Sequence, residues 1–146
     1  MTDISVNTND VSVSDPQRAI VNDFIAGEAI TAGQALYINS DGKAALASAS
    51  AAGTSAVIGV ALDSAGVNQV VPVLSVGYLE GLDLSGVDYN TLVSLSDTPG
   101  ALDDGAGSPT TVAPGGRVMP ATDGKLTKLL LVNFYYNLTV EPTAAA

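Results

Sequence analysis

The sequence predicts an all-β protein, a small barrel or sandwich assembled from two related β units in tandem. Short apolar and β-branched runs are separated by turns rich in Gly, Pro and Asp, and this spacing is typical of such folds. Residues 34–46 also have a loose second copy at residues 91–102. In both, an apolar strand runs into Ser-Asp, a turn containing Gly and then Ala-Leu. The length of 146 residues fits one domain.

The duplication extends beyond these two segments. Residues 57–62 follow the first copy and residues 115–119 follow the second, and each piece leads into a dense apolar run, at residues 70–76 and 129–134. The chain is therefore expected to divide into three parts: an extended N-terminal arm at residues 1–24, a β domain at residues 25–138 and a loose C-terminal tail at residues 139–146.

The first unit is predicted to begin with a hairpin. Residues 35–39 have the apolar pattern of a strand, and Asp41-Gly42 is a strong signal for a two-residue type I′ turn, which needs positive φ at both positions. Residues 44–55 are rich in Ala, Ser and Gly without helical periodicity, so we expect a short strand followed by a loop.

Two further strands complete this unit. Residues 57–63 form a predicted strand, in which Gly59 marks a bulge or a close approach of another backbone. Residues 69–76 are β-branched and contain Pro72, which has no N–H to donate. This strand is therefore expected to lie at a sheet edge or to be bulged at Pro72.

The second unit is predicted to follow the same plan with a longer connection. Three Pro and three Asp residues fall in the middle of it, which indicates a long loop. Asp123-Gly124 repeats the hairpin signal. The expected elements are a strand at residues 91–95, a loop at residues 96–116, a strand beginning at residues 117–120, and the most apolar strand at residues 126–138.

The N-terminal arm alternates polar and β-branched residues over residues 2–15. This pattern indicates an extended segment that becomes ordered by pairing with a partner, although a frayed terminus or an ordinary edge strand would give the same pattern. Residues 16–24 fit either a short helical turn, with Asp15 as its cap and Pro16 first, or a strand. The predicted partner-binding residues are the apolar members of the arm: Ile4, Val6, Val11 and Val13.

Composition excludes several classes of partner. There are 15 acidic residues against 5 basic ones, and the formal net charge of −10 disfavours binding to nucleic acid and to anionic membranes. Residues 44–62 are uncharged, but Ala, Ser, Thr and Gly dominate them, so we expect no membrane insertion. The first ten residues contain two Asp and no basic residue, unlike a secretory signal.

Chemistry at a catalytic or metal site is also not expected. The chain contains no Cys and no His, which excludes thiolate nucleophiles, imidazole bases, disulfides and most transition-metal sites. Asp97, Asp103 and Asp104 do not match a calcium-loop pattern, and no Gly-x-Ser-x-Gly or phosphate-binding motif is present. The sequence therefore predicts no enzyme, no cofactor and no metal.

The segments AGQALYINSDGKAALA, AVIGVALDSA, QVVPVLSVG, NTLVSLSDTPGAL, GGRVMPATDG and KLLLVNF together resemble head decoration (cement) proteins of tailed bacteriophages. This resemblance implies a β-tulip-like fold and a virion protein, made in the host cytoplasm, on the outer surface of the assembled capsid. It further implies a homotrimer that binds and bridges major capsid protein subunits, with the N-terminal arm adding to a strand of the shell. We expect removal of residues 1–15 to weaken attachment and leave the fold intact.

Two other functions remain open at this point. Related β modules occur in head fibres and tails, where a receptor- or glycan-binding module would need exposed aromatic rings; the candidates are Tyr78, Tyr89, Tyr135 and Tyr136. A hydrolytic virion enzyme would need two acids across a cleft. The acids available for that role are Asp63, Glu80, Asp83 and Asp88.

Overall fold

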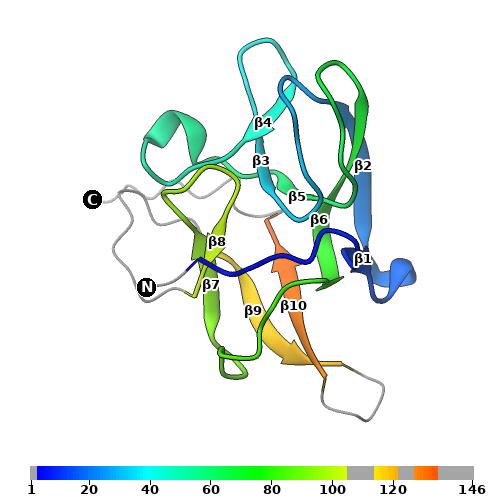
Figure 1. Cartoon of the computed structure of the whole chain (residues 1–146), viewed down its shortest axis with the longest axis vertical. Coiled ribbons are helices and arrows are strands. Elements are labelled where there is room, and N and C mark those ends of the chain that lie inside the picture. The colour runs from blue at the N-terminus through cyan, green and yellow to red at the C-terminus, as the bar shows by residue number, and fades with distance from the viewer. Residues whose placement is uncertain (1–2, 105–113, 122–126, 135–146) are drawn as a thin grey trace.

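The computed structural model describes residues 3–104, 114–121 and 127–134. Within these ranges the regular secondary structure is almost entirely β strand, which confirms the predicted all-β class (Figure 1). The described helical elements are two single 3₁₀ turns, Pro16–Arg18 and Ala52–Thr54. The strands are β1 (Ser12–Val13), β2 (Ile20–Ile25), β3 (Ala35–Ile38), β4 (Ala44–Leu46), β5 (Gly59–Ala61), β6 (Val70–Glu80), β7 (Leu92–Leu95), β8 (Leu102–Asp103), β9 (Pro114–Pro120) and β10 (Lys128–Asn133).

The strands form one curled antiparallel sheet in the order β4-β3-β5-β6-β10-β9-β7-β8, with β1 and β2 also paired to β6. The four strands of the first unit and the four of the second follow one another in mirrored order across the sheet. In each unit a hairpin (β3–β4 or β7–β8) pairs through its first strand with β5 or β9, which in turn pairs with β6 or β10. The duplication is therefore confirmed as two four-stranded units joined by the β6–β10 pair.

The longest strand, β6, pairs with four other strands: β1, β2, β5 and β10. Val76 pairs with both Ile20 and Asn133, and Leu79 has partners in both β1 and β10, so β10 lies on the edge of β6 opposite to β1 and β2. Leu74 has partners in both β2 and β5, which places β5 on the same edge as β10. The chain before residue 26 thus covers one edge of β6, through β1 and β2. The other edge is covered by β5 of the first unit and β10 of the second.

The expectation that the strand around Pro72 lies at an edge is wrong, because β6 is central. The Pro72 carbonyl accepts a hydrogen bond from the Leu62 N–H at 2.8 Å, so the backbone of Pro72 faces the side of β5. There β5 has already ended, at Ala61. The N–H that proline lacks would have returned this bond to the Leu62 carbonyl, so the β5–β6 ladder ends at Ala61, beside Pro72.

Residues 3–13, called the N-terminal segment below, lie against the protein's own sheet. Asp3 forms a bridge with Asp103 of β8, and the Ile4 N–H donates to the Leu102 carbonyl at 2.7 Å. Further along, the Asn7 N–H donates to the Gly81 carbonyl at 2.8 Å, and β1 then pairs with the end of β6. The boundary that we expected after residue 24 falls inside β2, which belongs to the sheet.

The turn of the β3–β4 hairpin differs from the expected type. Gly42 has φ of +78° but Asp41 is not in the positive-φ region, so the β3–β4 turn is not type I′. The Gly42 N–H donates to the Asn39 carbonyl, and the Asn39 N–H donates to the Lys43 carbonyl. This is a type I turn followed by a glycine bulge, which also matches the twist of a hairpin.

The long loop predicted at residues 96–116 contains two strands: all of β8 and the beginning of β9. A tight turn at residues 96–101 precedes β8, and the Gly100 carbonyl accepts from the Ala35 N–H at 2.9 Å, so this turn docks on the first unit. Several sequence predictions fall outside the described residues: the Asp123-Gly124 turn, the end of the last strand at residues 135–138 and the tail at residues 139–146.

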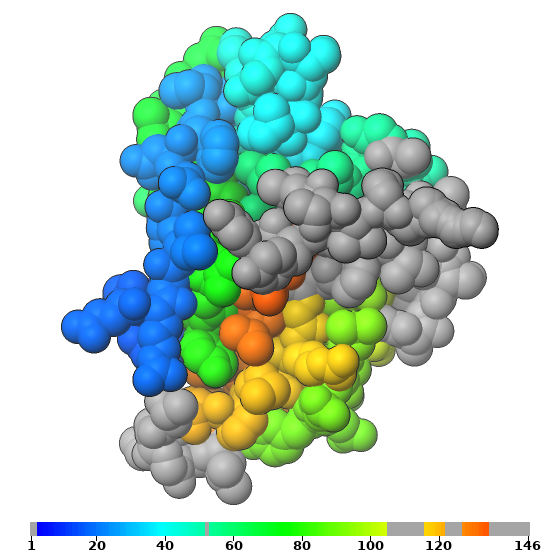
Figure 2. Space-filling view, turned by 180° about the vertical axis from the view of Figure 1, so that it is seen from behind, coloured from blue at the N-terminus to red at the C-terminus, as the bar shows by residue number. Residues whose placement is uncertain are grey.

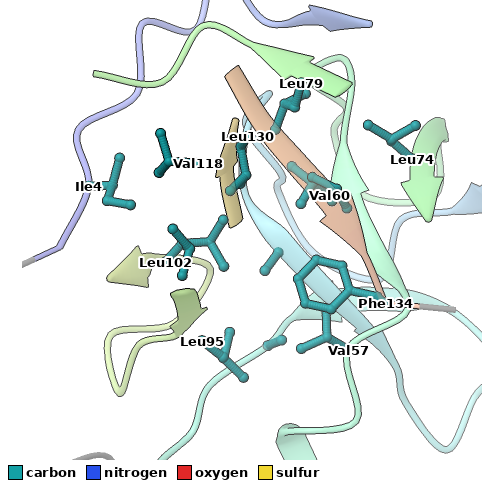
Figure 3. Packing of buried hydrophobic residues seen from close by; sticks show 14 of the residues in the cluster. Ile4, Val57, Val60, Leu74, Leu79, Leu95, Leu102, Val118, Leu130 and Phe134 are labelled. Carbon is teal, nitrogen blue, oxygen red and sulfur yellow. The ribbon is translucent and has the colours of Figure 1, made fainter. Parts of the chain in front are cut away.

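Two apolar cores are separated by the strands of the first unit. The larger core lies inside the curl and combines side chains of both units; Figure 3 shows Phe134 from the end of β10 beside Val57 of the first unit. The smaller core lies on the other face of β3, β5 and β6, where Leu36 and Val73 are buried. Because both faces of these strands are covered, their sequence is nearly continuously apolar rather than alternating.

Candidate partner-binding surface

The four predicted partner-binding residues lie against the protein's own core. Ile4 is only 8% exposed and belongs to the larger core, and Val11 and Val13 pack against that core from outside. Val6 is half-buried and lies directly on Gly33, where a Cβ atom would collide with its Cγ1. In this arrangement the polar neighbours of these four side chains face solvent, and a role of the four in binding a partner stays a prediction.

Exposed apolar side chains gather instead on β2 and at the start of β6. Of the seven large hydrophobic side chains that are exposed among the described residues, five belong to this region: Ile20, Val21, Ile25, Val67 and Val70. Ile25 is paired directly with Val70, which is 56% exposed. Single exposed apolar residues are ordinary, but neighbouring ones, such as the paired Ile25 and Val70, are typical of a protein–protein contact.

The backbone of β2 is paired on one side only among the described residues. The Pro72 backbone faces β5, so the opposing Asp23 is not hydrogen-bonded to β6, and its N–H and C=O point away from the sheet. By the two-residue period of a strand, the same holds for Val21 and Ile25, whereas Asn22 and Phe24 face β6. We call the outward backbone groups of Val21, Asp23 and Ile25 the β2 edge. It lies along the outer side of the molecule in Figures 1 and 2.

Among the described residues, no basic side chain forms an ion pair with Asp23. The ion pair seen within the described ranges joins Arg18 to Asp15, at 3.4 Å, just before β2. Asp23 itself is exposed and carries its charge between the apolar side chains of Val21 and Ile25. A surface of this kind combines apolar contact area with one negative charge and a set of backbone donors and acceptors.

An open hollow of about 920 Å³ lies between the N-terminal segment and the end of β6. Its lining includes three acids, Asp10, Glu80 and Asp83, and one basic residue, Lys128. Asp83 accepts hydrogen bonds from the Ser85 hydroxyl at 2.7 Å and from the Ser85 N–H at 3.2 Å, and these bonds lower the pKa of Asp83. A lowered pKa suits a permanently ionised turn residue and is opposite to what a general acid requires.

The acids of the predicted loop are not gathered into a cation site. Asp103 is fully buried in β8, whereas Asp97 is exposed in the preceding turn. In that turn the Ser96 hydroxyl accepts from the Thr98 N–H at 3.0 Å and donates to Asp3 at 2.6 Å. Throughout the described ranges, no group of three or more His, Cys, Asp or Glu residues is placed to hold a metal ion.

The candidate aromatic residues for a glycan site are also dispersed. Tyr89 is exposed with the Lys128 amine 5.4 Å from its ring centroid, and Tyr78 is half-buried in β6. The Lys128 amine also donates to the Val87 carbonyl at 2.6 Å, which ties β10 to the segment before β7. Tyr135 and Tyr136 lie outside the described residues.

The β2 edge was missed by reasoning from the sequence. Residues 16–24 gave conflicting signals for a helical turn and a strand, and the structure contains both, a 3₁₀ turn followed by β2. The missing N–H of Pro72 is no signal for this edge, because the Pro72 backbone faces β5 and not β2. Which strand lies opposite Pro72 is a matter of tertiary pairing and is not encoded locally.

No family model, no curated protein and no solved structure matches the chain. Among the described residues, no helix is long and apolar enough to cross a membrane.

Proposed function

We propose that this protein is a virion structural protein that binds the outer surface of an assembled bacteriophage capsid. It stabilises the shell by bridging major capsid protein subunits, and it does so as a homotrimer made in the host cytoplasm. The observation that carries the proposal is the gathering of exposed apolar side chains along β2 and the start of β6. The sequence resemblance to decoration proteins names the partner.

The fold supports a binding role in a second way. β6 holds both units and the N-terminal segment together through its two edges, so the exposed strand β2 is presented on a stiff sheet. A preorganised surface loses little conformational entropy when it binds, which favours affinity. The acidic surface, with a net charge of −10, keeps free copies apart until they meet a partner of complementary charge.

The mechanism requires no covalent chemistry. A subunit that contacts neighbouring capsid proteins binds only the assembled shell, so its binding free energy favours assembly over disassembly by mass action. Three-fold symmetry would let each copy make the same contact with a shell subunit. The expected result is a shell that withstands heat and low ionic strength better as sites fill.

Sedimentation tests this proposal directly. The purified protein is mixed with empty shells assembled from the major capsid protein of the virus that encodes it, and bound copies are counted in the pelleted fraction. We expect saturable binding and a higher temperature of shell disruption. Shells that pellet without the protein, or that are disrupted at the same temperature when saturated with it, would contradict the proposal. Native mass spectrometry of the free protein tests the trimer separately.

A further inference from the structure

We propose that the β2 edge receives an extended strand of the partner protein, and that this strand carries a basic side chain between two apolar ones. The inference rests on the proposed function for the identity of the partner, a capsid subunit. It differs from the arrangement that the resemblance implies, because here the decoration protein supplies the sheet and the partner supplies the strand.

Backbone geometry carries the first step. Val21, Asp23 and Ile25 each direct an N–H and a C=O away from β6, and no described residue accepts or donates to them. Three donors and three acceptors repeat at every second residue, which is the pattern that an added strand satisfies. An unpaired strand edge of this length is otherwise a site of unwanted association, so natural proteins cover it or charge it.

Side-chain chemistry carries the second step. Val21, Asp23 and Ile25 alternate with Asn22 and Phe24, so their side chains share one face of β2, and that face is exposed. On an added strand, the residues directly opposite lie on the same face. Apolar residues are therefore preferred opposite Val21 and Ile25, and Lys or Arg opposite Asp23. The preferred segment reads apolar, any, basic, any, apolar in either strand direction.

A second copy of this chain fits the edge poorly. When two β2 strands pair antiparallel with Val21 opposite Ile25, Asp23 of one copy lies opposite Asp23 of the other. Like charges directly opposite one another destabilise a sheet, and the net charge of −10 on each copy adds repulsion. Asp23 thus selects against self-pairing and in favour of a basic strand.

The shell-binding experiment distinguishes this inference from the proposed function. Asp23→Lys reverses the charge of the β2 edge, and Asp41→Lys makes the same change at the exposed turn of the β3–β4 hairpin. We expect Asp23→Lys to weaken shell binding about tenfold, since a favourable cross-strand pair is replaced by a repulsive one, and Asp41→Lys to bind like the unchanged protein. Equal binding by the two variants would overturn the inference while leaving the proposed function standing.

A peptide titration tests the edge without shells. The probe is a synthetic peptide with the alternation Val, Thr, Lys, Thr, Val, and its control carries Glu in place of Lys. We expect the first peptide to shift the amide resonances of residues 20–25 and the control to shift them far less. Equal effects of the two peptides, or shifts at β2 that depend only on the protein's own concentration, would overturn the inference; the latter would make a second copy the occupant.

Discussion

Gly59 of β5 and Gly116 of β9 occupy equivalent positions in the two units. Each is paired with the first strand of its own hairpin, through Leu36 and Val93 respectively. Each also lies so close to the next strand that a Cβ atom would collide with a backbone carbonyl oxygen, that of Leu74 or of Leu131. The duplicated fold therefore depends on the absence of a side chain at the same point of both units.

We expect Gly59→Ala and Gly116→Ala each to lower the free energy of unfolding by about 1–3 kcal/mol, because backbone must shift to admit the methyl group. Denaturant unfolding measures this as a lower midpoint. Gly86→Ala is the matched control, because nothing lies within 4 Å of the added atom. An unchanged denaturation midpoint in both Gly59→Ala and Gly116→Ala would contradict the close approach of the neighbouring strands to these glycines.

Truncating Phe134 should be the most damaging single change in the larger core. Its side chain is fully buried, and its N–H donates to the Ser75 carbonyl at 2.9 Å, which fixes the end of β10 on β6. We expect Phe134→Ala to cost about 3–5 kcal/mol of stability. Thermal unfolding checks this, with Tyr89→Ala as an aromatic truncation outside the core.

The position of Ile4 changes what a truncation should do. Because Ile4 fills part of the larger core, removing the N-terminal segment should destabilise the fold rather than leave it intact. We expect Ile4→Ala alone to lower the free energy of unfolding by about 2–5 kcal/mol, and Ser5→Ala, at the exposed neighbouring position, to have little effect. Equal stability of the two variants would show that the segment does not pack as described.

Hydrogen exchange should alternate along β2. The amides of Asn22 and Phe24 face β6 and should exchange slowly, whereas those of Val21, Asp23 and Ile25 face outward and should exchange fast. Residue-resolved exchange measured by NMR checks this in the free protein. In shell-bound protein, the three outward amides should become protected. Uniform protection in the free protein would mean that the β2 edge is already paired.

Asp83 should titrate at a lower pH than an ordinary aspartate. The Ser85 hydroxyl, and then the Ser85 N–H, lower the pKa of Asp83 by stabilising its ionised form. Because the folded-state pKa is below that of the unfolded chain, ionised Asp83 favours folding above the unfolded pKa, and this contribution disappears as the pH falls through the folded pKa. We expect Ser85→Ala to raise the pKa measured by NMR, and Ser40→Ala to leave it unchanged.

The repeat was predictable because its signals are local. The hairpin segments, the piece containing Gly59 and the apolar run that became β6 all appear in the sequence in the order in which they pair. The close approach at Gly59 was also anticipated, since glycine in a strand often marks one. What could not be anticipated was the partner of each strand edge. Pro72 indicated an edge, yet it lies in the central strand β6, which has β2 on one edge and β5 and β10 on the other.

The candidate surface was harder to predict for the same reason. An alternating segment such as that containing Ile4 and Val13 has the same sequence pattern whether it pairs with its own sheet or with another protein's. The turn at Gly42 shows a smaller ambiguity, since Asp-Gly serves both a two-residue turn and a three-residue turn with a bulge. In each case the long-range contact, and not the local sequence, selects the outcome.

The sharing of β6 has a mechanical consequence. Its two edges hold strands from opposite ends of the chain, β1 and β2 on one side and β10 on the other. A force that pulls the start of the chain away from β10 along the strand direction would load these ladders in shear, where several backbone hydrogen bonds must break together. Resistance to stretching would thus reside in one eleven-residue strand, and a single-molecule pulling experiment would register it as one rupture event rather than two.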